Sequence, residues 1–289
     1  MPENTSHGLT NCRHVASRRA GAVEYLERCP QQTEVSTEAF PAKLATGLAE
    51  ASALLNKYHD TGDAELLDRA AQVTCDASRE MPDDDPHLGA TLSYYEAIMD
   101  AQLVGAGIIE SRSLDKAVEV AERALSATPL GHPCRGIRCS NLSSWKGRRF
   151  EWHSYPADLE MAIENAESAL VAFAADGTLK AGVCNNLGYW LGRRFDLVHH
   201  LSDLDRAVDV TQEAVAETPC GDPLLGVRLN NLAVRLHRRF METWTGSDID
   251  RAIQVAHMAV QTPGISVWID RCFWLIWAIT ILLVPDKSD

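Results

Sequence analysis

A motif of three residues recurs along this chain at a fixed distance. Arg-Arg-Phe occupies positions 148–150, 193–195 and 238–240, so both steps are 45 residues (193 − 148 = 45; 238 − 193 = 45). Two further markers keep the same step, an Asn-Leu pair that recurs from Asn141 onward and an Asp-Leu motif that recurs from Asp158 onward, with isoleucine in place of leucine in its third copy. Because three independent markers share one register, the chain is an array of structural repeats.

The same pattern extends toward the N-terminus in a weaker form. Ser113-Leu-Asp-Lys-Ala-Val begins 45 residues before Asp158 (158 − 113 = 45). Leu66-Leu-Asp-Arg-Ala-Ala begins 47 residues earlier still (113 − 66 = 47). We therefore expect five units, at residues 41–85, 86–132, 133–177, 178–222 and 223–263.

Each unit has the pattern of two helices. In the last unit the apolar residues step by three or four positions, as on one face of a helix: Leu225, Leu229, Leu232, Leu236 and Phe240. A second such run follows Thr245, with Ser247 or Asp248 as its expected N-cap and Pro263 as its end. Since no segment shows sustained apolar–polar alternation, we predict an all-α fold, an α-solenoid of stacked antiparallel helix pairs.

The second helices resemble those of the tetratricopeptide repeat (TPR). Ala207, Ala214 and Pro219 follow one another at steps of 7 and 5, as in that family's signature (214 − 207 = 7; 219 − 214 = 5). The unit is longer than the usual length of about 34 residues. This long form looks like the repeats of large fungal proteins, where they often flank a caspase-like (CHAT) protease domain or a nucleotide-binding switch domain.

The TPR resemblance implies a concave groove lined by the first helices, which receives a peptide or a partner helix. The positions that would line it here are Asn185, Tyr189, Arg193, Asn230, Arg238, Ser144 and Arg148. Asparagine amides would bind the peptide main chain, and arginines would bind a carboxylate. A structural alternative stays open, because asparagines also join neighbouring units and arginines near a helix C-terminus favour the helix dipole. The phenylalanines of Arg-Arg-Phe are expected in the core.

The sequence contains no motif that indicates catalysis. It has no phosphate-binding Gly-rich loop, no Gly-x-Ser-x-Gly and no His-Glu-x-x-His. His199 and His200 are interpreted as solvated loop residues rather than metal ligands, since no further ligand stands at a suitable spacing. We therefore expect neither an enzyme nor a bound cofactor or metal.

Eight scattered cysteines without a Cys-x-x-Cys pair, and the lack of an apolar leader, predict free thiols in a cytoplasmic protein. A net charge of −13 argues against nucleic acid as the partner.

The two ends differ from the repeats. We expect a flexible segment at residues 1–38, the repeat domain at 39–263, and an apolar helix or tail at 264–289. Within the tail, 273–284 has one polar residue in twelve; as a helix it would span about 18 Å, short of the roughly 30 Å of a bilayer core. A final helix packed on the last unit is favoured over a membrane anchor, and a partner-binding surface remains an alternative.

Two functions follow from these observations. The first is a non-catalytic scaffold that binds a protein or peptide partner in the concave groove. The second is a truncated regulatory fragment of a larger fungal switch or protease protein. A resumed Asn-Asn-Leu pattern in the genomic sequence after the codon for Pro263 would favour the second.

Overall fold

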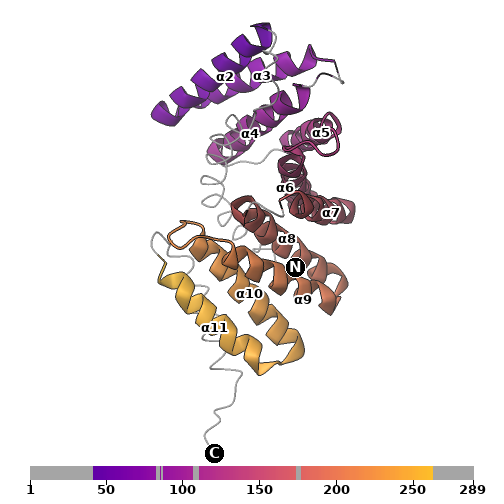
Figure 1. The fold of residues 1–289 in the computed structure, drawn as a ribbon, viewed down its shortest axis with the longest axis vertical. Helices are drawn as coiled ribbons and strands as arrows, with labels where there is room; N and C mark the ends of the chain where they lie inside the picture. Colours follow the sequence, from indigo (N-terminus) through magenta and orange to yellow (C-terminus); the bar gives the residue numbers. More distant parts are fainter. Residues whose placement is uncertain (1–41, 83–84, 86, 107–110, 174–176, 263–289) are drawn as a thin grey trace, which may run out of the picture. The chain divides into compact units, whose positions relative to one another are not determined.

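The computed structural model describes residues 42–82, 85, 87–106, 111–173 and 177–262, and every regular element in these ranges is an α-helix (Figure 1). The helices are α2 (Ala42–Thr61), α3 (Ala64–Arg79), α4 (Leu88–Ala106), α5 (Ser111–Ser126), α6 (Arg135–His153), α7 (Pro156–Ala172), α8 (Gly177–Val198), α9 (Leu201–Ala216), α10 (Leu225–Thr243) and α11 (Gly246–Val260). Two helices correspond to each predicted unit, to within one residue. The prediction of an all-α helical repeat is confirmed.

The chain forms two compact units, of which one ends at Ser154 and the other begins at Tyr155. In the first unit, α2 packs on α3, α3 on α4, α4 on α5, and α5 on α6. In the second unit, α7 to α11 do the same, and α8 also contacts α10 (Figure 1). Packing between neighbours in the sequence is the defining property of a solenoid, in which each repeat contacts the repeats beside it.

Small residues let the helices of a repeat approach closely. The alanines of the TPR-like signature, Ala207 and Ala214 in α9 and Ala252 and Ala259 in α11, are fully buried. The first helices contribute aromatic side chains to the core. Phe150, Phe195 and Phe240 are 2%, 1% and 4% exposed, so the expectation that these residues lie in the core is confirmed.

Three of the first helices end in the same way, with a residue in the left-handed conformation four positions after the core phenylalanine. Ser154, His199 and Trp244 have φ values of 57°, 54° and 55°. Each donates its backbone N–H to the phenylalanine carbonyl, at 2.7, 2.8 and 2.7 Å respectively. The rings of His199 and Trp244 lie edge-on against Phe195 and Phe240, at 5.5 Å between centroids in both pairs. Glycine usually occupies this position at the end of a helix, because a side chain disfavours the left-handed conformation.

The predicted N-cap of the last helix is wrong. Thr245 is the N-cap and α11 begins at Gly246, so Ser247 and Asp248 lie inside the first turn. The carboxylate of Asp248 is used by Arg239 of α10 instead, at 2.8 Å from each oxygen. A bidentate charged partner is a stronger competitor for a carboxylate than a helix N-terminus is.

The segments 1–38 and 264–289 lie outside the described residues, as does the apolar run 273–284. Among the helices that the structure describes, none combines the length and the apolar character that a membrane span needs.

Candidate interaction surface

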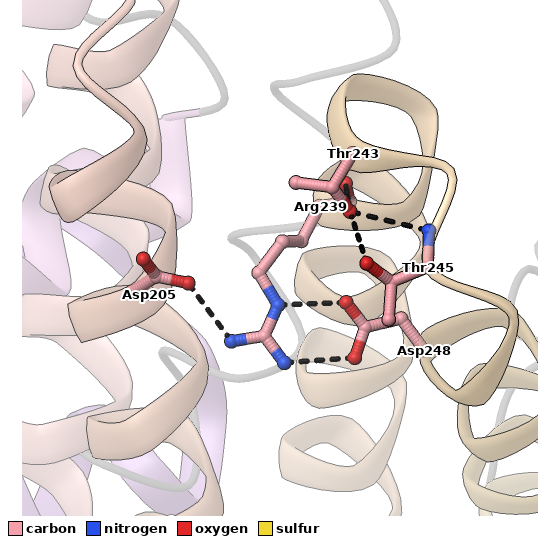
Figure 2. A network of polar contacts seen from close by, with 5 residues as sticks. All are labelled: Asp205, Arg239, Thr243, Thr245 and Asp248. Carbon is pink, nitrogen blue, oxygen red and sulfur yellow. Dashed lines mark hydrogen bonds and ion pairs between the residues drawn. The ribbon is translucent and has the colours of Figure 1, made fainter.

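The second arginine of each Arg-Arg-Phe motif joins helices of the repeat array. Arg239 binds both carboxylate oxygens of Asp248 in α11 and one oxygen of Asp205 in α9, the latter at 3.1 Å (Figure 2). Arg194 makes the same contacts one repeat earlier, with Asp203 at 2.6 and 3.0 Å and with Glu160 of α7 at 2.8 Å. A first helix is thereby tied to its own second helix and to the second helix before it.

These pairs are partly shielded from water. The side chain of Asp203 is 8% exposed and that of Asp248 is 10% exposed. Donating hydrogen bonds to these carboxylates raises the pKa of the Arg194 and Arg239 guanidinium groups above the ordinary arginine value. In the first unit, Arg149 lies 3.3 Å from Asp115, at the same spacing of 34 residues (149 − 115 = 34; 239 − 205 = 34). The sequence carried this signal, because Arg and Asp recur nine positions apart in two successive repeats.

The first arginines of the second and third Arg-Arg-Phe motifs bind a different carboxylate from the second arginines. Arg193 and Arg238 both lie 3.1 Å from the carboxylate of Asp196, one from each of two consecutive first helices. Arg238 also lies 3.9 Å from Glu242 and 5.6 Å above the ring of Phe195. Their side chains are 35% and 44% exposed. The structure thus brings together two of the predicted groove residues around one acidic side chain that sequence reasoning missed.

The asparagines of α8 and α10 differ in whether another residue already binds their side chains. Asn231 donates from Nδ2 to Oδ1 of Asn185, at 2.8 Å, and so joins α10 to α8. In the first unit, Asn141 donates in the same way to Glu96 of α4, at 2.7 Å. Asn230 is half-buried on α10, and its side chain makes no hydrogen bond with any described residue. One predicted asparagine, Asn185, is therefore already engaged through its oxygen, whereas Asn230 is available to a ligand.

Arg235 of α10 is half-buried beside Tyr189 of α8. The guanidinium of Arg235 stands 5.5 Å above the ring of Tyr189, and Nε of Arg235 is buried without a hydrogen bond from the described residues. Burial lowers the pKa of Arg235 below the ordinary arginine value. Gly192 makes the space for it, since a Cβ at that position would lie 2.8 Å from Nη1 of Arg235. The sequence gives one sign of this arginine's unusual place. Tryptophan occupies the equivalent position in the two preceding repeats, at Trp145 and Trp190, and Arg235 replaces it in the third (235 − 190 = 45).

The other two predicted groove residues belong to the first unit. Ser144 donates its hydroxyl to the carbonyl of Ser140 within α6, at 3.1 Å. The guanidinium of Arg148 stands 4.6 Å above the ring of Trp145. Both side chains are half-buried.

Comparison with solved structures identifies the architecture. A kinesin light chain-like protein of Podosopora anserina with nearly identical TPR-like repeats superposes with a TM-score of 0.52 at 13% identity, over 77% of this chain and all of the other. The chain has a TPR-like helical-repeat fold. BtubC (BKLC) from P. vanneervenii superposes with the same TM-score at 20% identity, over 91% of this chain and 96% of the other. No protein-family model and no curated protein sequence matches the chain.

Histidines and cysteines are the side chains to consider for metal binding. In the part of the chain that the structure describes, no three His, Cys, Asp or Glu side chains gather closely enough to hold a metal ion. His199 and His200 are both exposed, and they occupy the turn between α8 and α9. The described cysteines are free; Cys75, Cys134, Cys139 and Cys184 are buried, and Cys220 is exposed.

Proposed function

We propose that this TPR-like protein is a non-catalytic interaction scaffold, and that it binds an extended peptide or a helix of a partner protein on the first helices of its second unit. We call the binding face the α8–α10 surface and define it by Asn185, Tyr189, Arg193, Asn230 and Arg238. Asn185, Tyr189 and Arg193 follow one another at four-residue steps on one face of α8, and Asn230 and Arg238 share one face of α10.

The observation that carries the proposal is that the Asn230 side chain has no hydrogen-bond partner among the described residues. Its amide is half-buried and makes no hydrogen bond with a described residue, two turns before the 44% exposed Arg238 on the same helix face. A carboxamide offers one acceptor and two donors, which match the C=O and N–H groups of an extended main chain. Because Asn230 is only half-buried, water satisfies these groups in the free protein, and a bound main chain would replace that water.

The charges of the surface indicate which contacts would be strong. A partner carboxylate near Arg238 would add a charge-assisted hydrogen bond, which is stronger than a neutral one. Asp196 already shares Arg193 and Arg238, so an acidic partner group would compete with it for the two guanidinium groups. Binding through such pairs weakens as the salt concentration rises.

A pull-down from an extract of the source cells tests this proposal. The surface variant combines Asn185→Ala, Arg193→Ala, Asn230→Ala and Arg238→Ala. The control variant, Arg206→Ala with Arg251→Ala, also removes two positive charges, but from exposed positions on α9 and α11. We expect the wild-type protein and the control to recover the same partner, and the surface variant to lose it. Equal recovery by the surface variant, with unchanged helical circular dichroism, would rule out the α8–α10 surface as the binding site.

A further inference from the structure

A third arginine, Arg235, lies near the two that share Asp196. Its guanidinium makes no hydrogen bond or ion pair with any described residue, and its side chain is half-buried. Burial lowers its pKa most, against the opposing effects of Tyr189 and Asp196. The positive charges of Arg193 and Arg238 lower the pKa further, so the three arginines are close enough to repel one another. A positive group with five N–H donors therefore stands beside this pair without an acceptor among the described residues.

The neighbouring helix α8 holds this guanidinium in place. A Cβ on Gly192 would lie 2.8 Å from Nη1 of Arg235 and 3.0 Å from its Cζ, so only a glycine leaves room for the planar group. The ring of Tyr189 lies 5.5 Å from the same Cζ, within the range of a cation–π contact. An arginine that is positioned before binding loses less conformational freedom when an anion arrives.

Asp196 determines which anion the three arginines can bind. It already supplies an acceptor to Arg193 and to Arg238, at 3.1 Å each, and Glu242 reaches Arg238 at 3.9 Å. A carboxylate from a partner would only replace Asp196 with a group of the same charge. A phosphate monoester carries nearly two negative charges at neutral pH and three strong acceptor oxygens, so it can bind all three guanidinium groups. The cluster therefore favours a phosphate over a carboxylate.

We propose that Arg193, Arg235 and Arg238 bind a phosphorylated side chain of the partner peptide. This inference rests on the proposed α8–α10 surface, and it names the chemical class of the partner. Asn230 lies eight residues before Arg238 on α10 (238 − 230 = 8), which corresponds to about 12 Å along the helix. Since an extended peptide rises by about 3.3 Å per residue, the phosphorylated residue lies about four residues from the one whose main chain contacts Asn230.

Fluorescence polarisation with three labelled, degenerate peptide libraries tests this proposal on the full-length protein. The libraries carry phosphoserine, glutamate or serine at one fixed central position. We expect the phosphoserine library to bind at least about tenfold more tightly than the glutamate library, because of its second charge and third oxygen. The serine library should bind most weakly.

Two variants and a control assign the preference to the arginine cluster. Arg235→Trp introduces the residue that Trp190 supplies one repeat earlier, so it removes the charge with a side chain that the repeat already accommodates. Arg238→Ala provides a second test in case the first variant does not fold, as judged by circular dichroism. Both should remove most of the preference for phosphoserine over glutamate. Arg206→Ala, which removes a charge from an exposed position on α9, should keep it.

Equal binding of the phosphoserine and glutamate libraries would overturn the inference, as would no binding of the phosphoserine library or an unchanged preference in the folded variants. Displacement of the peptide by an equal concentration of inorganic phosphate would show that the free anion is the ligand, with the same consequence. The proposed function has a separate readout, because Asn230→Ala should weaken all three libraries alike. If Asn230→Ala has no effect while the phosphoserine preference persists, the phosphate site stands and the main-chain contact does not.

Discussion

At the scale of single residues, Asp248 shows how a short polar side chain in a repeat acquires a role that local pattern does not reveal. Its position near a helix start indicated a cap, but the structure uses it as the bidentate partner of Arg239. Asp205 lies on the other side of the same guanidinium and is 62% exposed, compared with 10% for Asp248. Because both carboxylates bind the same guanidinium, removing each in turn shows how burial changes the contribution of an ion pair to stability.

We expect Asp248→Ala to lower the free energy of unfolding by about 1.5–3 kcal/mol, because it leaves a partly buried guanidinium short of two charge-assisted hydrogen bonds. Asp205→Ala should cost under about 1 kcal/mol, as is usual for an exposed ion pair. Urea unfolding followed by circular dichroism measures both. Equal effects of the two substitutions would show that burial does not decide the strength of these pairs.

Glu96 provides a pH-dependent test in the first unit. Burial raises the pKa of its carboxyl group from an ordinary value of 4.5 to about 8, although Asn141 donates a hydrogen bond to it. The folded protein therefore holds a proton that the unfolded chain has released at neutral pH, and stability falls as the pH rises from about 4.5 to about 8. We expect Glu96→Gln to remove most of this fall, measured as the urea midpoint at several pH values. Parallel profiles for the variant and the wild-type protein would contradict it.

At the scale of elements, the length and pairing of the helices could be predicted from the sequence, because the 45-residue step fixes them. The spacing of nine residues between Arg and Asp indicates the contacts of the second arginines, but the contacts of Arg193 and Arg238 with Asp196 could not be predicted, because the first and second arginines of one motif look alike in sequence. Their roles separate only when Arg193 faces Asp196 and Arg194 faces Asp203. The contact between Tyr189 and Arg235 could not be predicted either, because it joins two helices through residues 46 positions apart (235 − 189 = 46).

Two glycines of α8 make a matched pair for the packing of elements. A Cβ at Gly188 would contact Thr211 Oγ1 and lie 3.2 Å from the carbonyl oxygen of Ala207, whereas a Cβ at Gly182 would meet nothing within 4 Å. We expect Gly188→Ala to lower the stability by about 1–3 kcal/mol through overpacking. Gly182→Ala should raise it by about 0.5–1 kcal/mol through helix propensity. Thermal unfolding of both variants measures the difference.

The next repeat supplies the control for this prediction. Ala233 takes the place of Gly188 there, and Ala256 takes the place of Thr211 (233 − 188 = 45; 256 − 211 = 45). Adding Thr211→Ala to Gly188→Ala should therefore recover most of the lost stability. If the double variant is no more stable than Gly188→Ala alone, the close approach of α8 and α9 is not the cause.

At the scale of the whole molecule, the TPR-like fold follows from the repeat, but the binding face does not. Repeats build similar first helices throughout, and only the contacts tell which polar positions are already used. Asn185 accepts a hydrogen bond from Asn231, so its Oδ1 is shared with a neighbouring helix, whereas Asn230 keeps its donors and acceptor. The two asparagines occupy equivalent positions of successive repeats (230 − 185 = 45), and they differ because Asn185 has Asn231 of the next first helix as its donor.

The affinity for a recovered partner tests the central claim of the scaffold most directly. Isothermal titration calorimetry would compare the wild-type protein with Asn230→Ala/Arg238→Ala and with the control Arg206→Ala/Arg251→Ala. We predict that the first pair raises Kd by at least about tenfold, equivalent to about 1.4 kcal/mol, and that the control stays within about twofold of wild type. An unchanged Kd for Asn230→Ala/Arg238→Ala would contradict the assignment of the α8–α10 surface as the binding site.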